Sequence, residues 1–306
     1  MRLAFAASLA LLAAGCSYSS TRTWRPTPIA GATEPSEVIA GSSAADWAPI
    51  PAEDLLVMDL GDGTRVVIQL APGFAPVHVA NIRAFARGGW WDNATIYRMQ
   101  DNYVAQWGNG DAKVPLPPGV VRTPPAEYDR PSDSGPVQPH AYPDAYASYV
   151  GHYQGWPIAW NDQMRTWLIH CYGTVGVGRD LAPDTGTGGE LYAVIGHGPR
   201  HLDRNIANVG RVIEGMPNLS ARPRGTGNLG FYQTERGERP IPITRIRVAS
   251  DLPEAERPRF EVMRTESETF RRYVTGRANR GGTFFNVPAG GVDICNAPVP
   301  VRRRAG

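Results

Sequence analysis

The sequence predicts a mainly β protein, built as a closed barrel or a sandwich of short strands. Short apolar segments separated by turns that contain Gly and Pro recur from about residue 54 to residue 250, and few segments have helical spacing. The chain of 306 residues contains 34 glycines and 28 prolines. This composition is rich in loops and turns, and it argues against a helical bundle.

The first part of this region predicts a hairpin followed by a helix. Residues 55–59 and 65–70 are strand candidates on either side of Gly61-Asp62-Gly63, which is a favourable hairpin turn. Residues 75–87 place apolar side chains at the spacing of one helix face, and Gly88-Gly89 is expected to end that helix. Two further short strands are expected after it, at 95–99 and 104–107.

The strand pattern returns in the second half of the chain and ends near residue 248. Strands are expected at 173–179, 190–195, 206–213 and 240–248. Residues 254–272 are charged and predict a short helix that Pro258 interrupts. The chain closes with a Gly- and Pro-rich tail over 281–301.

A long insert separates the two halves. Residues 113–163 are dense in Pro, Tyr, Trp and Gly, and we expect an elaborated surface loop without regular structure there. We therefore predict one domain over 54–252 that carries this insert, followed by a C-terminal extension over 253–306.

The N-terminus has the features of an export signal. Residues 3–14 form an apolar run that is too short to span a bilayer comfortably, since spanning takes about 20 residues. Cys16 follows small residues, as in a bacterial lipobox, so residues 1–15 are expected to be a lipoprotein signal and Cys16 the lipidated residue. Ordinary cleavage after a small residue is the alternative. Residues 16–53 predict a flexible tether.

These features place the protein on the periplasmic side of the cell envelope, where it is anchored to a membrane through lipid. Ser17 after the cysteine favours the outer membrane over the inner one. Cys171 and Cys295 remain as an even pair in an oxidising compartment, so we expect either a disulfide between them or two unrelated buried thiols.

Several other functions are disfavoured. The net charge of +2 gives no strong attraction to nucleic acid. His197 and His201 have the spacing of metal ligands, but no third ligand is near them in the sequence, and no metal is expected. His170-Cys171 fits burial better than nucleophilic chemistry, and the run Gly186-Thr187-Gly188-Gly189 lacks the Lys-Ser/Thr of a phosphate-binding loop.

One stretch of the sequence resembles a known family. Ala75-Pro76, Asn81, Gly88-Gly89-Trp90-Trp91-Asp92, Tyr97-Arg98, Tyr103-Val104-Ala105-Gln106 and Gly108-Asn109-Gly110-Asp111 follow the order of the cyclophilin-type peptidyl-prolyl isomerases. The second half is similar to that family at Leu202-Asp203, Val209-Gly210-Arg211-Val212 and Glu214-Gly215-Met216. Together these motifs cover roughly residues 54–250 apart from the insert.

The resemblance implies a cyclophilin-like closed eight-stranded antiparallel β-barrel with capping helices. It implies rotation about the Xaa-Pro amide bonds of exported proteins, which assists their folding in the cell envelope. No bond is broken, so no cofactor is needed. The expected partners of the protein are proline-containing segments of exported proteins, and we expect the protein to be a monomer.

The resemblance also assigns the site. Arg98 and Gln106 match the catalytic pair, and Arg98 is expected to be the donor over the proline nitrogen. The substrate-binding positions are Tyr103, Val104, Gly178, Glu190, Tyr192, Leu202 and Ile206.

Several of these residues depart from the family pattern. Val104 replaces a Met, Tyr192 a Phe, Glu190 a Gln and Ile206 a His, while Tyr97 replaces the His before the arginine. We expect Glu190 to pair with Arg179 or Arg98, and the hydroxyl of Tyr192 to require a partner. These departures suggest an alternative function. The protein would then be a catalytically weak module of the same fold that binds Pro-containing segments of envelope proteins.

Overall fold

The chain folds around a closed β-barrel. The computed structural model describes residues 29–109, 114–133, 137–281 and 284–304. Eight antiparallel strands close the barrel in the order β11-β12-β5-β4-β14-β2-β3-β13. Their bounds are β2 Leu55–Leu60, β3 Arg65–Leu70, β4 Thr95–Met99, β5 Val104–Gly108, β11 Thr174–Val177, β12 Leu191–Val194, β13 Asn208–Glu214 and β14 Ile241–Val248.

Strand alternation places one apolar set inside the barrel. Ala105 and Trp107 of β5 and Leu191 and Ala193 of β12 are buried in the central core, while Val104 and the residues that alternate with it face outward. Helix α2 (Pro76–Arg87) packs Val79, Ile82, Phe85 and Ala86 against this core, and the short α3 (Met216–Ser220) adds Leu219. The predicted mainly β class and eight-stranded barrel are confirmed.

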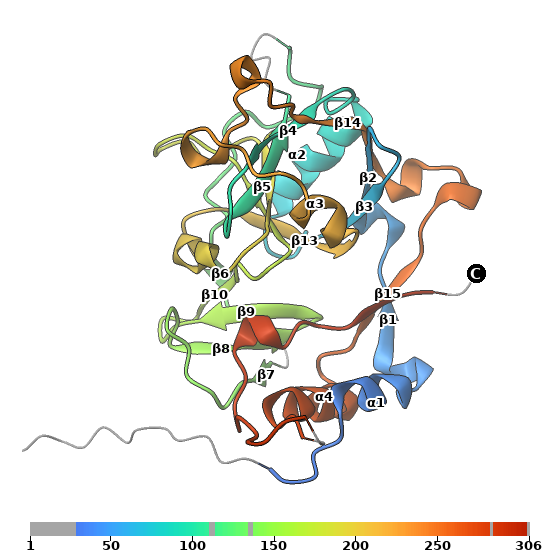
Figure 1. Cartoon of the computed structure of the whole chain (residues 1–306), viewed down its shortest axis with the longest axis vertical. Helices are drawn as coiled ribbons and strands as arrows, with labels where there is room; N and C mark the ends of the chain where they lie inside the picture. Colours follow the sequence, from blue (N-terminus) through green and yellow to red (C-terminus); the bar gives the residue numbers. More distant parts are fainter. Residues whose placement is uncertain (1–28, 110–113, 134–136, 282–283, 305–306) are drawn as a thin grey trace, which may run out of the picture.

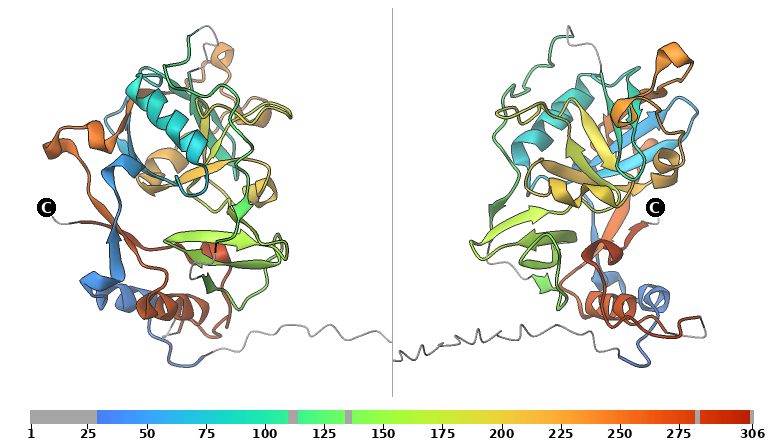
Figure 2. Two further views of the ribbon diagram at one scale, coloured as in Figure 1. Left: turned by 180° about the vertical axis from the view of Figure 1, so that it is seen from behind. Right: turned by 60° about the vertical axis from the view of Figure 1, so that its left-hand side comes forward.

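A second body lies on one side of the barrel (Figures 1 and 2). It consists of two sheets, in the orders β1-β15-β16 and β6-β10-β9-β8-β7, and of helices α1 (Pro35–Ala40) and α4 (Glu268–Ala278). The strands are β1 Trp47–Pro49, β6 Arg130–Pro131, β7 Gln138–Pro139, β8 Tyr149–Tyr153, β9 Trp156–Trp160, β10 Arg165–Leu168, β15 Phe260–Met263 and β16 Val301–Arg303.

The flexible tether predicted for residues 16–53 is wrong for its second part. Residues 35–53 contain helix α1 and strand β1, and Val38, Trp47 and Ile50 are buried. They pack with Phe260 and Phe270 of the C-terminal extension against the outer side of β2 and β3. Their few apolar side chains lack periodicity, so only this distant packing explains their order. Residues 1–28, with the predicted signal and Cys16, lie outside the described residues.

Two further expectations need correction. The insert 113–163 is not an irregular loop, because its residues form β6 to β9, and β10 completes the five-stranded sheet. The predicted helix over 254–272 is instead strand β15 followed by α4, which begins after Ser267, whose side chain accepts a hydrogen bond from the Phe270 amide at 3.0 Å.

The second body is covalently linked to the barrel. Cys171, just before β11, forms a disulfide with Cys295 of the C-terminal extension, with the two Cα atoms 5.1 Å apart. The structure therefore favours the predicted pairing over two unrelated thiols. No helix among the described residues has the length and apolar character needed to cross a membrane.

Candidate active site

The candidate site is a row of residues across four neighbouring barrel strands. Arg98 on β4 pairs with Gln106 on β5, Gln106 pairs with Tyr192 on β12, and Tyr192 pairs with Gly176 on β11. A register shift between Ile96 and Arg98 keeps Ile96 in the core while Arg98 lies on the outer surface. This row therefore faces away from the core.

A cavity of about 490 Å³ lies over this row. It brings together nearly all of the predicted site residues, namely Arg98, Tyr103, Val104, Gln106, Gly178, Tyr192, Leu202 and Ile206. Val104 and Tyr192 form an apolar cluster with Val194, against which Tyr103, Leu202 and Ile206 pack. Its apolar wall suits a proline ring, and its volume leaves room for the neighbouring residues of a peptide. The polar side chains that line it are Arg98, Gln100, Gln106, Arg179 and His201.

Arg98 is held in place on three sides. Its Nη1 donates to Gln106 Oε1 at 2.9 Å, its Nε donates to the Leu229 carbonyl at 2.7 Å, and its Nη2 donates to Gln100 Oε1. A guanidinium has five N–H donors, so these contacts leave two for a ligand. Burial lowers the pKa of Arg98, but an arginine stays charged in a protein.

The structure adds residues that the sequence did not identify. Gln100 and Leu229 line the cavity, and so does Arg179, which was expected only as a partner of Glu190. The Phe231 ring centroid lies 5.6 Å from Arg98 Cζ, and the ring is stacked on Tyr97. Leu229 and Phe231 belong to the segment between β13 and β14, about 130 residues after Arg98. No spacing signal connects them, since only the barrel brings this segment to the edge of β4.

Glu190 is the predicted site residue that does not line the cavity. It pairs with neither Arg179 nor Arg98, so that expectation is wrong. Instead its Oε2 accepts a hydrogen bond from the Tyr97 hydroxyl at 2.5 Å, and the Tyr97 oxygen accepts one from Gln106 Nε2 at 2.7 Å. The carboxyl group occupies space that a side chain at Gly108 would fill. Glu190 thus lies behind Gln106, where it orients the Gln106 amide through Tyr97.

The site has an unusual acid. Burial raises the pKa of Glu190 to about 7, although the hydrogen bond from Tyr97 opposes this shift. Burial and the neighbouring Glu190 charge also raise the pKa of Tyr97. The folded state therefore holds the Glu190 proton over a pH range in which an unfolded glutamic acid has lost it.

This pKa predicts that Glu190→Gln stabilises the protein at alkaline pH. Between pH 4.5 and about 7 the folded state binds more protons than the unfolded state, so the stability of the wild type falls as the pH rises. At pH 8 the variant is expected to be more stable by about 3 kcal/mol, because the pKa difference between 4.5 and about 7 corresponds to 1.36 kcal/mol per pKa unit. At pH 4 the two proteins are expected to be equally stable, as measured by urea unfolding.

Glu235→Gln is the matched control. Glu235 is exposed on the surface, so its replacement is expected to change stability by less than about 0.5 kcal/mol at either pH. Parallel stability curves for Glu190→Gln and the wild type between pH 4 and pH 8 would contradict the assigned protonation.

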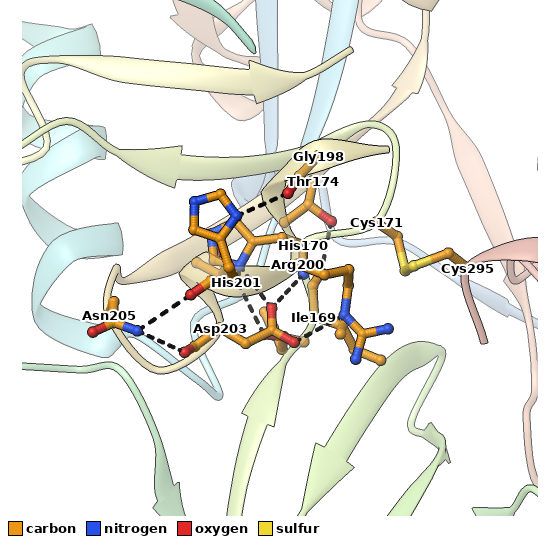
Figure 3. Close-up of polar contacts among 12 residues, drawn as sticks. Ile169, His170, Cys171, Thr174, Gly198, Arg200, His201, Asp203, Asn205 and Cys295 are labelled. Atoms are coloured by element: carbon orange, nitrogen blue, oxygen red, sulfur yellow. Dashed lines mark hydrogen bonds and ion pairs between the residues drawn. A yellow bond between two sulfur atoms is a disulfide. The ribbon is translucent and has the colours of Figure 1, made fainter. Parts of the chain in front are cut away.

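The His201 ring, which lines the cavity, has structural partners. His201 Nδ1 lies 2.9 Å from the Gly198 carbonyl and its Nε2 lies 3.1 Å from the Tyr103 hydroxyl, so both ring nitrogens are engaged (Figure 3 shows the Gly198 contact). Within the described ranges, no group of three or more His, Cys, Asp and Glu side chains is arranged to hold a metal ion.

Comparison with known proteins identifies the same family as the sequence motifs. The model of the family "Cyclophilin type peptidyl-prolyl cis-trans isomerase/CLD" matches residues 55–248. Probable peptidyl-prolyl cis-trans isomerases from Brucella suis and Brucella melitensis are each 26% identical over 187 residues, which covers 60% of this chain and 76% of theirs.

A solved structure extends the likeness beyond the barrel. The crystal structure of cyclophilin AquaCyp293 from Hirschia baltica matches with a TM-score of 0.66 and 25% identity, over 84% of this chain and 93% of that one. This coverage is larger than the 55–248 range of the family model, so part of the second body has a counterpart there.

Proposed function

Because the chain belongs to the cyclophilin-type peptidyl-prolyl cis-trans isomerases, we propose that the cavity over Arg98 is where it rotates Xaa-Pro amide bonds. The observation that carries this assignment is the position of the Arg98 guanidinium, which is fixed by three hydrogen bonds at the edge of an apolar cavity. The proline ring packs against the apolar wall of the cavity, which is formed by Val104, Tyr192, Leu202 and Ile206.

The chemistry follows from the electronic structure of the amide. Resonance gives the C–N bond partial double-bond character and a rotation barrier of about 18–20 kcal/mol. In the twisted state this resonance is lost, and the proline nitrogen regains a lone pair that can accept a hydrogen bond. A free N–H of Arg98 donates to this nitrogen only in the twisted state, so the interaction lowers the barrier instead of merely binding the substrate.

Gln106 has two roles in this proposal. Its Oε1 holds Arg98, and its Nε2 is fixed by Tyr97. Each amide atom has one further hydrogen-bonding position, which can contact the backbone of the peptide. Gly178 lies beside it, since a Cβ there would come within 3.1 Å of Gln106 Nε2. The residue preceding proline lies against this open position.

The activity is tested by NMR exchange spectroscopy on an Ala-Pro peptide. The soluble chain from residue 29 onward is expected to accelerate cis–trans exchange at substoichiometric concentration, against an uncatalysed time of tens to hundreds of seconds. Peptide binding without acceleration would instead support the binding module that the altered pocket residues favour.

We propose further that the enzyme acts on exported proteins in the cell envelope, on the periplasmic side. The apolar run 3–14 before Cys16 supports export and a lipid anchor. The disulfide between Cys171 and Cys295 supports an oxidising compartment. Cys16→Ala is expected to abolish incorporation of labelled fatty acid into the protein. Equal incorporation in the variant and the wild type would contradict lipidation of Cys16.

A further inference from the structure

Tyr192 lies in the wall of the proline cavity, and its hydroxyl group contacts a histidine, His170. This oxygen lies 2.9 Å from His170 Nε2, in a space that Gly176 leaves open because it has no side chain. Tyr192 is only 5% exposed. A buried hydroxyl without a partner is costly, so the position of this ring depends on His170.

His170 is in turn oriented by a carboxylate. Its Nδ1 lies 2.8 Å from Asp203 Oδ1, and its backbone amide donates to the same oxygen at 2.9 Å. The Nδ1–H therefore donates to Asp203, and Nε2 accepts the hydrogen bond from Tyr192. The His170 side chain is completely buried. Figure 3 shows this histidine beside Asp203, and it also shows the disulfide that the next residue, Cys171, forms with Cys295.

The chain of contacts continues into the insert. Arg200 Nε donates to Asp203 Oδ2 at 3.0 Å, and its Nη1 and Nη2 donate to the two carboxylate oxygens of Asp144 at 3.0 and 2.7 Å. Side-chain exposures are 4% for Arg200, 3% for Asp144 and 6% for Asp203. These three charges lie out of water, where Arg200 faces both carboxylates and its charge-assisted hydrogen bonds fix their geometry.

Asp144 is separated from Arg200 by 56 residues and belongs to the insert. We propose that Asp144 is a positioning residue for the proline cavity, which it reaches through Arg200, Asp203 and His170 to the hydroxyl of Tyr192. The insert thus sets the affinity of the enzyme for proline peptides without touching the substrate. This inference rests on the proposed function of the cavity.

The physical reason is that each link orients the next. Loss of the Asp144 charge frees the Arg200 guanidinium from its bidentate partner. Arg200 then no longer fixes Asp203, and the His170 ring can turn. The Tyr192 hydroxyl loses its acceptor, and the ring moves in the cavity wall. The three hydrogen bonds that hold Arg98 involve none of these residues, so rotation chemistry at Arg98 is left intact.

A double-mutant cycle tests this inference. Asp144→Asn is expected to weaken binding of an Ala-Pro peptide about 3- to 10-fold, as measured by NMR titration, with little change in the exchange rate at saturation. Tyr192→Phe removes the last link, so Asp144→Asn is expected to cause no further weakening in that background. A purely structural role would give the same loss in both backgrounds.

Two further variants keep the test decisive. Tyr153→Phe removes a partly buried hydrogen bond to Asp133 within the insert, and it is expected to leave peptide affinity unchanged. If Asp144→Asn does not fold, Arg200→Lys takes its place, because it keeps the charge but loses the fork that holds both carboxylates. Equal affinity of Arg200→Lys and the wild type would overturn the inference.

The same experiment separates the two proposals. Failure of the proposed function appears as absence of catalysed exchange in the wild type. Failure of the positioning role appears as a catalytically active wild type whose peptide affinity is insensitive to Asp144, or whose sensitivity does not depend on the Tyr192 hydroxyl.

Discussion

Arg98→Ala is expected to lower kcat/KM for Xaa-Pro isomerisation by about 100- to 1000-fold, the usual cost of removing one donor that acts on the transition state. The substitution removes the N–H that reaches the twisted nitrogen and leaves the apolar wall of the cavity in place. Most of the loss is therefore expected in kcat, with peptide affinity reduced only slightly. The measurement is NMR exchange at several peptide concentrations.

Arg98→Lys and Arg272→Ala are the matched variants. The lysine keeps the charge but cannot donate to Gln100, Gln106 and Leu229 while reaching the substrate, so it is expected to lose nearly as much activity as the alanine. Arg272 is exposed on α4 in the second body, and its replacement is expected to have no effect. If Arg98→Ala retained at least a third of the wild-type kcat/KM, the assigned role of Arg98 would be wrong.

Loss of the disulfide is expected to have the largest effect on stability. Cys171 and Cys295 are 124 residues apart in the sequence, and closing a loop of this length restricts the unfolded chain by about 5 kcal/mol in the chain-entropy estimate. Replacement of both cysteines by alanine is therefore expected to reduce the free energy of unfolding by about 3–5 kcal/mol. Urea unfolding with and without reductant measures this change.

When the disulfide is broken, the C-terminal extension is expected to unfold before the barrel. Cys295 and Ile294 pack with Val150, Trp167 and Ile169 of the second body, so this contact is released when the link is broken. Limited proteolysis of the reduced protein is expected to cleave near residue 295 before the barrel. The double alanine variant serves as the control, since reductant has no bond to act on there. An equal response of both proteins to reductant would show that the disulfide does not stabilise the fold.

Much of the barrel could be predicted from the sequence because its rules are local. The hairpin around Gly61-Asp62-Gly63, the helix that ends before Gly88 and the strand at 191–194 each follow from residues that are close in the chain. The site residues that line the cavity could be named because motif order and spacing carried the family resemblance. Glu190 was placed at the site by the same reasoning, but its partner could not be predicted.

The second body shows where local reasoning stops. Trp47, Phe260 and Phe270 come from opposite ends of the chain and share one core. In the insert, β8 and β9 form a hairpin around Gln154-Gly155, but β7 pairs with β8 and β6 with β10 only across longer connections. The many prolines and glycines of the insert mask its strands, and the segment 16–53 has few apolar residues. The sequence pattern is therefore that of a tether, a loop and a broken helix.

The sequence by itself therefore determined the β class, the barrel strands and, through the family resemblance, the choice of Arg98 and Gln106. It left a disulfide and two unrelated thiols as alternatives for Cys171 and Cys295. The tertiary structure alone decided how these residues act. A register shift between Ile96 and Arg98 turns the arginine outward, whereas simple strand alternation would place both on the core side. Contacts at separations of 56 and 131 residues hold Arg200 and Arg98 in place. Such contacts leave no periodic signal, because they depend on the closure of the barrel and not on neighbours in the chain.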